Sequence, residues 1–540
     1  MRQQTDGENH RAQPSETAPM TDVQVIVAAN RGPVQFYEYT DSRALHRQAS
    51  GGLATAFVSL AGQVDFSWVA VASTPLERKA FEEHPNRVLR IGSSTLSTRY
   101  VVVPDHLYQQ YYTSISNALL WFAQHYLLSP DAAPDFGQTY QRDWDEGYKA
   151  VNRTIAAALG ETIRARPVSE QNRVVVMLQD YHLYLVPGFL RAAIPEVALT
   201  HFIHIPWPAV RYWQLLPHRI ALEILTSLLA NDVIGVQTAL DVRNLLSCIE
   251  ELLPEVIVER SSEAGTLTWQ GRRILVKAYP ISIDPAHVRA LAQSPSAQRS
   301  YQAISRHFDV QTILRVDRIE PSKNIVLGLH AFALLLKRHP QLRGRVRFVM
   351  ILVPSRENLP RYRQYAREVL ALADVINARY AGLGGDVVVP VVGNDQARAL
   401  AAMRSSNVML VNSLIDGMHL GAKEFAVVNE RQGVLILSRT AGVAHELGEQ
   451  AALHITPTDV QETADALYRA LTMDATERVA MAETARRLVE SHTITQWIDQ
   501  QLRDAITQAP QGIPTPLRPC KPQRAWVKPR TTAKSPAMPR

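Results

Sequence analysis

Short apolar runs that alternate with amphipathic stretches are the feature that most constrains the fold of this chain. Most of the runs are continuously apolar, which is typical of parallel strands buried on both faces. A helical pattern between them covers Ile325–Arg338, with Leu327, Phe332, Leu335 and Leu336 facing inward. The predicted strands are Val23–Ala28, Val174–Leu178, Ala198–Ile205, Val233–Val236, Ile274–Ala278, Thr312–Val316, Val346–Val353, Val387–Val392, Val408–Val411 and Val434–Leu437. This β–α order predicts an α/β fold with doubly wound sheets.

A chain of 540 residues is too long for one ordinary core and long enough for two domains. Pro280 ends a strand, and a new helical region starts at Pro285. We therefore expect two Rossmann-like domains, 22–284 and 285–508, that face one another across a cleft. The polar N-terminal extension 1–21 and the proline-rich tail 509–540 are expected to be disordered.

The formal charge of +6 belongs to the tail and not to the folded part. Residues 511–540 carry seven lysines and arginines and no acid, while residues 1–21 carry two arginines and three acids. Without these two segments the net charge is zero, so the folded core has no bulk electrostatic reason to bind nucleic acid.

Other features bear on the location and chemistry of the chain. No apolar run approaches the ~20 residues of a membrane span, and the N-terminus lacks an apolar signal core. The two cysteines, Cys248 and Cys520, are too few for a disulfide framework, which favours a reducing cytoplasm. No HExxH, paired CxxC, GxSxG or Walker lysine loop is present, which argues against a zinc hydrolase, a serine esterase and a P-loop ATPase.

The run Asp416-Gly417-Met418-His419-Leu420-Gly421-Ala422-Lys423-Glu424 follows a predicted strand and opens a predicted helix. Such a junction places backbone N–H groups and the positive helix end at the carboxyl edge of a sheet, where α/β folds bind anions. Glu424 lies about two turns further on, where its carboxylate could accept from ribose hydroxyls.

A second candidate anion-binding element is Arg318-Ile319-Glu320-Pro321-Ser322-Lys323. Arg318 ends a predicted strand, and a helix that Ser322 or Asn324 could cap begins directly after it. Arg318 and Lys323 then flank a helix N-terminus, which is a strong local field for a diphosphate. Taken alone, the same residues also fit a solvated surface loop.

Polar residues follow the strands of the first half as well. Arg31 lies in a turn after the first strand, and the Gly51-Gly52 pair would let the backbone approach a ligand. Asp180 follows a buried strand and suits sugar hydroxyls, although it could instead cap a helix. His204 precedes a rigid Pro-Trp-Pro turn, and a structural role is the alternative. Arg356 ends a strand of the second half.

An aromatic segment, Tyr111 to Trp121, could stack on sugar C–H faces, although aromatic side chains at helical spacing usually form core.

In order and spacing, the motifs together resemble the trehalose-6-phosphate synthase family of retaining glycosyltransferases, which have the GT-B fold. The resemblance runs from about Val23 to Leu502. It rests on Asn30-Arg31, Ser50 to Leu53, Tyr112 to Trp121, Asp180 to His182, His204 to Pro206, Arg318 to Lys323, Ser355-Arg356 and Asp416 to Glu424.

This resemblance implies transfer of glucose from a nucleoside diphosphate glucose, UDP-glucose being favoured, to glucose 6-phosphate, with retention and without a protein nucleophile or cofactor. It implies that the first domain binds the acceptor and the second the nucleotide sugar. The implied acceptor residues are Arg31, Tyr112, Trp121, Asp180 and Arg356. The implied donor residues are Gly52, Arg318 and Lys323 at the diphosphate, His204 and Asp416 at the sugar, Glu424 at the ribose, and Gly417, Met418, His419 and Leu420 in the same motif. Arg318, Lys323, His204 and Asp180 would be catalytic, and no metal is implied because the two cations and the helix end neutralise the leaving group.

The chain departs from the family pattern at two motifs. The usual Arg-Asp-Gly-Met-Asn is Ile415-Asp416-Gly417-Met418-His419 here, and the usual Arg-Leu-Asp-Tyr-Ser-Lys is Arg318 to Lys323 with Glu320 and Pro321. If the side chain of His419 reaches the donor pocket, sugar or base preference can differ.

Alternatives stay open at this point. A sibling with another phosphorylated acceptor, such as a glucosylglycerol-phosphate synthase or a cyclitol-joining pseudoglycosyltransferase, shares the scaffold. A non-catalytic sugar-phosphate sensor is the alternative of a different class. The sequence does not decide between a monomer and a homo-oligomer, and it names no partner for the tail.

Overall fold

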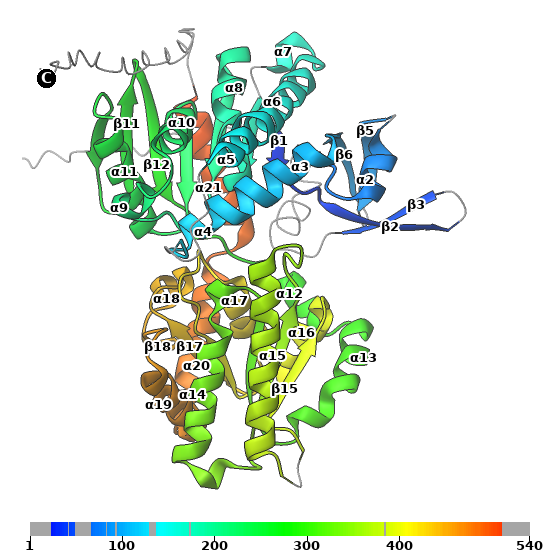
Figure 1. The fold of residues 1–540 in the computed structure, drawn as a ribbon, viewed down its shortest axis with the longest axis vertical. Coiled ribbons are helices and arrows are strands. Elements are labelled where there is room, and N and C mark those ends of the chain that lie inside the picture. Colours follow the sequence, from blue (N-terminus) through cyan, green and yellow to red (C-terminus); the bar gives the residue numbers. More distant parts are fainter. Residues whose placement is uncertain are drawn as a thin grey trace, which may run out of the picture.

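The computed structural model describes residues 23–40, 43–48, 66–82, 84–91, 94–128, 137–171, 174–382 and 385–509. Figure 1 shows two lobes, each built on its own sheet with helices on both faces, and the chain passes from one lobe to the other before α12. The expected α/β architecture of two doubly wound units is confirmed. The expected disordered extension 1–21 and residues 510–540 of the expected disordered tail lie outside the described residues.

The first sheet has ten strands in the order β10-β11-β12-β9-β8-β7-β1-β4-β6-β5. Its central strands pair in parallel, and the strands at both edges pair antiparallel. The strands of this lobe are β1 (Gln24–Ala29), β4 (Phe66–Val71), β5 (Asn86–Ile91), β6 (Ser94–Val101), β7 (Val174–Gln179), β8 (Ala198–Phe202), β9 (Val233–Val236), β10 (Ile257–Arg260), β11 (Ala264–Trp269) and β12 (Arg272–Ala278), besides the separate hairpin β2 (Val34–Thr40) and β3 (Arg43–Gln48).

The helices of this lobe include two unusual π-helices, η2 and η3. They are α2 (Pro75–Phe81), α3 (Asp105–Tyr108), η2 (Gln109–Leu120), α4 (Trp121–Gln124), α5 (Gln138–Arg142), η3 (Asp143–Tyr148), α6 (Lys149–Arg164), α7 (Val168–Gln171), the 3-10 turn η4 (Tyr181–Leu183), α8 (Val186–Ala193), α9 (Val210–Trp213), α10 (His218–Leu228) and α11 (Ala239–Leu252).

The second sheet has six strands, all parallel, in the order β15-β14-β13-β16-β17-β18. Its strands are β13 (Gln311–Arg318), β14 (Val346–Val353), β15 (Val388–Val392), β16 (Val408–Val411), β17 (Val434–Ser438) and β18 (Leu453–Ile455). Its helices are α12 (Pro285–Ala292), α13 (Pro295–Ile304), η5 (Ser305–Phe308), η6 (Pro321–Lys323), α14 (Ile325–Arg338), η7 (Pro340–Leu342), α15 (Pro360–Tyr380), α16 (Gln396–Ser405), α17 (Leu420–Val428), α18 (Gly442–Leu447), α19 (Val460–Thr472) and α20 (Ala475–Ser491).

Continuously apolar strands are buried on both faces, as their pattern predicts. In β1, Val25 and Val27 join the apolar cluster on one face, while Ile26 and Ala28 join the cluster on the other. The same alternation in β13 sends Ile313 and Leu314 to opposite faces of the second sheet. Because both faces need a helical cover, each sheet is sandwiched between helices and its ligand-binding edge is left at the strand ends.

The last helix, α21 (Ile494–Gln508), crosses back to the first lobe (Figure 1). Trp497 Nε1 donates to the carbonyl of Tyr279 at 3.0 Å, and Asp504 receives Lys277 Nζ at 2.7 Å and the Tyr279 hydroxyl at 2.6 Å. Chain order placed residues 494–508 in the second domain, and their packing corrects that assignment. The division at residue 284 stays a prediction.

One predicted strand is too long. Strand β8 ends at Phe202, whereas the apolar pattern extended it to Ile205, because the segment before the Pro-Trp-Pro turn leaves the sheet. Within the described part of the chain, no helix is both long enough and apolar enough to cross a membrane.

Candidate active site

A cleft of about 910 Å³ lies between the two lobes, at the carboxyl ends of strands from both sheets. Residues that follow β1, β7 and β8 form one wall, and residues that follow β13 and β14, together with the start of α17, form the other. Eleven of the residues predicted from the sequence line it: Arg31, Tyr112, Trp121, Asp180, His204, Arg318, Lys323, Arg356, His419, Leu420 and Glu424. Gly52 lies outside the described residues.

Arg31 and Tyr112 meet at the first-lobe end of the cleft. Arg31 Nη2 donates to the Tyr112 hydroxyl at 3.0 Å. Tyr112 projects from the π-helix η2, and π-helices often occur at functional sites. Burial alone would raise the pKa of Tyr112, but the positive charges of Arg31 and Arg356 outweigh burial and lower it. The expectation that the aromatic segment is ordinary core therefore holds for Tyr111, which is fully buried, and not for Tyr112.

Arg356 reaches this end of the cleft from the second lobe. Its guanidinium lies 4.7 Å above the ring of Trp121 and donates to the Tyr362 hydroxyl at 2.8 Å and to the Tyr181 hydroxyl at 3.3 Å. The backbone at Arg356 has a φ of 46°, a left-handed conformation that is costly for a non-glycine residue. The structure therefore brings Arg31 and Arg356, which come from different lobes, to one region lined with aromatic rings.

Asp180 and His204 lie side by side at the ends of β7 and β8. Asp180 Oδ1 accepts the His204 backbone N–H at 3.2 Å, and the φ of Asp180 is 72°. Its carboxylate makes no helix-capping hydrogen bond, so the alternative of a cap is wrong. Burial raises the pKa of Asp180 to about 6. Burial lowers the pKa of His204 to about 3, so its ring stays neutral, with Nε2 3.0 Å from Gln179 Oε1.

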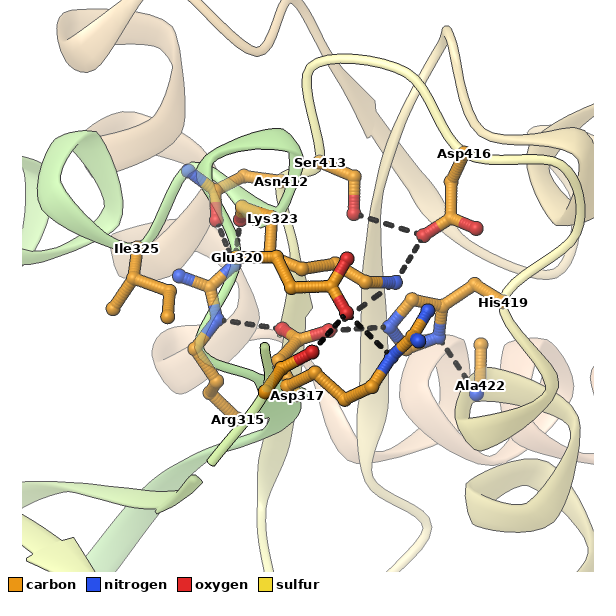
Figure 2. Close-up of polar contacts among 12 residues, drawn as sticks. Arg315, Asp317, Glu320, Lys323, Ile325, Asn412, Ser413, Asp416, His419 and Ala422 are labelled. Atoms are coloured by element: carbon orange, nitrogen blue, oxygen red, sulfur yellow. Dashed lines mark hydrogen bonds and ion pairs between the residues drawn. The ribbon is translucent and has the colours of Figure 1, made fainter. Parts of the chain in front are cut away.

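Lys323 lies opposite them, on the second-lobe wall. Its Nζ forms an ion pair with Asp416 and lies 3.5 Å from Asp317 Oδ1 (Figure 2). Burial alone would lower the pKa of Lys323, but the two carboxylates outweigh burial and raise it. Burial alone would also raise the pKa of Asp416, yet Lys323 outweighs it, so Asp416 stays ionised. Lys323 is thus a permanent cation at the cleft.

Arg318 is the exposed cation of the same wall. Its Nε lies 2.8 Å from Glu320 Oε1, and half of its side chain is exposed. A guanidinium held through Nε presents both Nη groups outward, the fork that suits a phosphate. The helix start beside it differs from expectation. Asn324 precedes α14, but its side-chain amide donates to the carbonyls of Asn412 and Pro457, and its side chain makes no capping hydrogen bond to the helix.

The start of α17 is held by His419. Its Nδ1 accepts the Ala422 backbone N–H at 3.3 Å, and its Nε2 lies 3.1 Å from Asp317 Oδ1 (Figure 2). Asp317 is in turn held by Arg315 Nε at 2.9 Å, and both side chains are fully buried. Both ring nitrogens of His419 are therefore used within the protein, so the ring borders the cleft without a free polar atom.

Three residues of the predicted donor motif do not line the cleft. Asp416 forms an ion pair with Lys323 and is not among the lining residues, and Met418 is buried in the apolar core. Gly417 has another role: a Cβ on it would lie 2.2 Å from the carbonyl oxygen of His204, so only glycine lets the two lobes touch here.

Glu424 lies in the second turn of α17 and borders the cleft. Its Oε1 accepts from Gln396 Nε2 at 3.4 Å, and burial raises its pKa to about 7. The neighbouring Lys423 points away from the cleft, to Glu446 at 2.5 Å and to the carbonyl of Ile281 at 2.7 Å. It therefore ties α17 to the crossover between the lobes.

Sequence reasoning did not name Asp317, and it named Glu320 only as a departure from the family motif, without a role. Both are buried carboxylates that hold the cations of the cleft, and both lie within two residues of Arg318. Carboxylates so close to predicted phosphate-binding cations were the available signal, because a buried charge needs a partner.

Two Rossmann-like lobes with cations at the cleft between their strand ends define a GT-B glycosyltransferase. The model of glycosyltransferase family 20 matches residues 23–507, and the chain belongs to that family. A trehalose-6-phosphate synthase of Mycobacterium leprae is 30% identical over 93% of this chain and 98% of its own length, and one of Mycolicibacterium paratuberculosis is 31% identical over 92% and 97%.

Solved structures agree with this assignment. A UDP-forming α,α-trehalose-phosphate synthase of Burkholderia xenovorans in complex with glucose 6-phosphate has a TM-score of 0.76 and 28% identity, and the match covers 90% of this chain and 100% of that chain. An E. coli structure bound with UDP-2-fluoro glucose has a TM-score of 0.75 and 28% identity, covering 89% and 98%.

Proposed function

We propose that this protein transfers glucose from UDP-glucose to glucose 6-phosphate with retention and so forms α,α-trehalose 6-phosphate. The observation that carries the proposal is the single cleft whose two ends are built for two different anions. One end has Arg31 and Arg356 among aromatic rings, and the other has Arg318 and Lys323 beside the start of α17. The names of the family relatives support the same reaction.

At the acceptor end, Arg31 and Arg356 bind the phosphate of glucose 6-phosphate as two forks on one dianion. Tyr112 and Trp121 provide the walls, since the Tyr112 hydroxyl accepts from Arg31 and the Trp121 ring faces the guanidinium of Arg356. Asp180 accepts from the acceptor hydroxyls, because its second carboxylate oxygen is not used by His204. The ligand of the related Burkholderia xenovorans structure, glucose 6-phosphate, supports this assignment.

At the donor end, Arg318 and Lys323 neutralise the diphosphate, Glu424 accepts from the ribose, and His204 borders the glucose. Asp416 acts through Lys323, since it forms an ion pair with that residue and does not line the cleft. The bond from glucose C1 to the diphosphate oxygen breaks, the anomeric hydroxyl oxygen of the acceptor bonds C1 from the same face, and its proton passes to the leaving diphosphate. The fixed cations stabilise the charge that develops on that oxygen.

A matrix of nucleoside diphosphate sugars against phosphorylated and unphosphorylated acceptors, with mass detection of the product, tests the proposal. We expect the mass of trehalose 6-phosphate only with UDP-glucose and glucose 6-phosphate together, and UDP release that needs both. A product with glycerol phosphate or a cyclitol phosphate alone would favour a sibling activity, and binding without any turnover would favour a sensor.

We also propose a cytoplasmic location, which the low cysteine content supports.

A further inference from the structure

Glu320 lies between the two arginines that serve different substrates. Its Oε1 lies 2.8 Å from Arg318 Nε and accepts the Ser355 hydroxyl at 3.0 Å, while Oε2 lies 3.3 Å from Arg356 Nη1. Its side chain is fully buried. One carboxylate therefore contacts the cation of the donor end and the cation of the acceptor end.

Glu320 keeps its negative charge although its carboxylate is buried. Burial alone would raise the pKa of Glu320, but Arg318 and Arg356 outweigh burial and lower it below its usual value. A buried carboxylate that keeps its charge must be held by its cations, and it holds them in return. Each arginine is therefore positioned in part by an anion that the other arginine also needs.

The two arginines are not held equally. Arg318 has a close contact to Oε1, whereas Oε2 accepts no hydrogen bond from any described residue and only faces Arg356 as an ion pair. When a phosphate binds Arg356, it competes with Oε2 for the same guanidinium. The carboxylate is then less neutralised from that side, so it holds Arg318 Nε more strongly and fixes the outward fork of Arg318.

We propose that Glu320 is a positioning residue that couples the two substrate sites, so that an occupied acceptor phosphate site tightens binding of the donor diphosphate. The inference rests on the proposed function for the identity of the two ligands. The length of the side chain matters, because Glu320 stands where the resembled family usually has aspartate, which is one methylene shorter. Coupling between two sites is reciprocal, so UDP would also tighten binding of glucose 6-phosphate by the same factor.

Calorimetric titration of UDP, with and without saturating glucose 6-phosphate, tests the coupling, because UDP carries no glucose and the ternary complex does not react. In the unchanged protein we expect glucose 6-phosphate to lower the Kd of UDP by about fivefold or more, the usual size of coupling between sites. In Glu320→Gln, which keeps the shape and removes the charge, the factor should fall to within about twofold of one. Glu462→Gln, a remote surface glutamate paired with Arg439, is the matched control and should keep the full factor.

Glu320→Asp keeps the charge but cannot span both arginines, so it should also lose most of the coupling, and it keeps the test decisive if the glutamine variant does not fold. Full coupling in a folded Glu320→Gln or Glu320→Asp protein, or no coupling in the unchanged protein, would overturn the inference and leave the proposed function standing. Failure of glucose 6-phosphate to bind the unchanged protein at all would overturn the proposed function and this inference with it.

Discussion

His419 Nε2 and Asp317 Oδ1 lie 3.1 Å apart, although 102 residues separate them in the chain. Because Nδ1 of the same ring accepts the Ala422 N–H, the ring proton lies on Nε2 and is donated to Asp317. The pair thus fastens the first turn of α17 to the end of β13, where Arg318 and Lys323 begin the other half of the donor site.

Replacing His419 tests what this fastening contributes. His419→Ala removes a helix cap, which costs about 1 kcal/mol of unfolding free energy, and frees the turn that carries Leu420 and Glu424. We expect the KM for the donor to rise about fivefold while the KM for the acceptor stays within about twofold. Steady-state kinetics with each substrate varied in turn measures both.

His419→Asn gives the residue that the resembled family usually has. Asparagine caps helices and tolerates the left-handed backbone at this position, but its shorter side chain does not reach both Ala422 and Asp317. We expect a smaller rise in the donor KM. His330→Ala, an exposed histidine on α14, is the control. Equal rises in both KM values for His419→Ala would point to a general loss of structure instead.

Lys323 should be needed for turnover. Lys323→Ala removes the cation that faces the leaving diphosphate, and one such group is typically worth 10²–10³-fold in kcat. It also leaves Asp416 and the buried Asp317 less compensated, so unlike a substitution in a surface loop it should lower the melting temperature by several degrees. Kinetics and thermal unfolding are measured together, with the exposed Lys337→Ala as control. Near-normal turnover in the folded variant would exclude the role.

The raised pKa of Glu424 makes a prediction for stability. Burial raises it from 4.5 to about 7, so between these values the folded protein keeps a proton that the unfolded chain has lost. Stability therefore falls as the pH rises from about 4.5 to 7, by up to about 1.4 kcal/mol per pH unit, and levels off above. Glu424→Gln should remove this contribution in urea unfolding at several pH values. The exposed Glu368→Gln should leave the slope unchanged.

The same group should make donor binding depend on pH. Only the ionised carboxylate accepts from both ribose hydroxyls, so the Kd of UDP should fall by up to about tenfold between pH 6 and pH 8. In Glu424→Gln that dependence should disappear. Calorimetry at the two pH values is sufficient, and an unchanged pH dependence in the variant would remove Glu424 from the ribose site.

Much of the fold was predictable because a buried parallel strand forms a continuous apolar run in the local sequence. Val233–Val236, Val346–Val353 and Val408–Val411 have the bounds expected from the sequence, and so does the helix Ile325–Arg338. The edge hairpin β10–β11 was missed because half-exposed strands such as Ile257–Arg260 carry charged and polar residues, so they show no apolar run.

The candidate site was predictable where a residue follows a strand, and less so where its role depends on a distant partner. Arg31, Asp180, Arg318 and Arg356 all line the cleft because strand ends converge there. The ion pair of Asp416 with Lys323 joins residues 93 positions apart in the chain, and no local pattern predicts it. The return of α21 to the first lobe is a long-range contact of the same kind.

The basic tail should be dispensable for the reaction. Residues 511–540 follow the last described helix, which ends at Gln508, and they carry seven basic residues and seven prolines. Deleting them should leave kcat and both KM values within about twofold and lower the pI. Assays over a range of protein concentrations measure this, and a loss of activity confined to dilute protein would instead give the tail a role in assembly.

The acceptor phosphate should account for most of the preference for the acceptor. Arg31 and Arg356 come from different lobes yet both act on Tyr112, so a dianion between them would join the lobes and exclude water before transfer. Each guanidinium–phosphate contact contributes about 1.5–3 kcal/mol, or roughly 10- to 150-fold in binding. Glucose should therefore be a very poor acceptor beside glucose 6-phosphate, as competition between the two in one assay would show.

Arg356→Ala identifies the origin of that preference. We expect kcat/KM for glucose 6-phosphate to fall by about 10- to 150-fold while the low value for glucose changes little, because only the phosphorylated sugar loses a contact. The control is Arg367→Ala. Arg367 is an exposed arginine on α15, the helix that begins shortly after Arg356, and its replacement should leave both values unchanged. Comparable efficiency with glucose and glucose 6-phosphate in the unchanged protein would contradict the assignment of Arg31 and Arg356 and would favour a different acceptor.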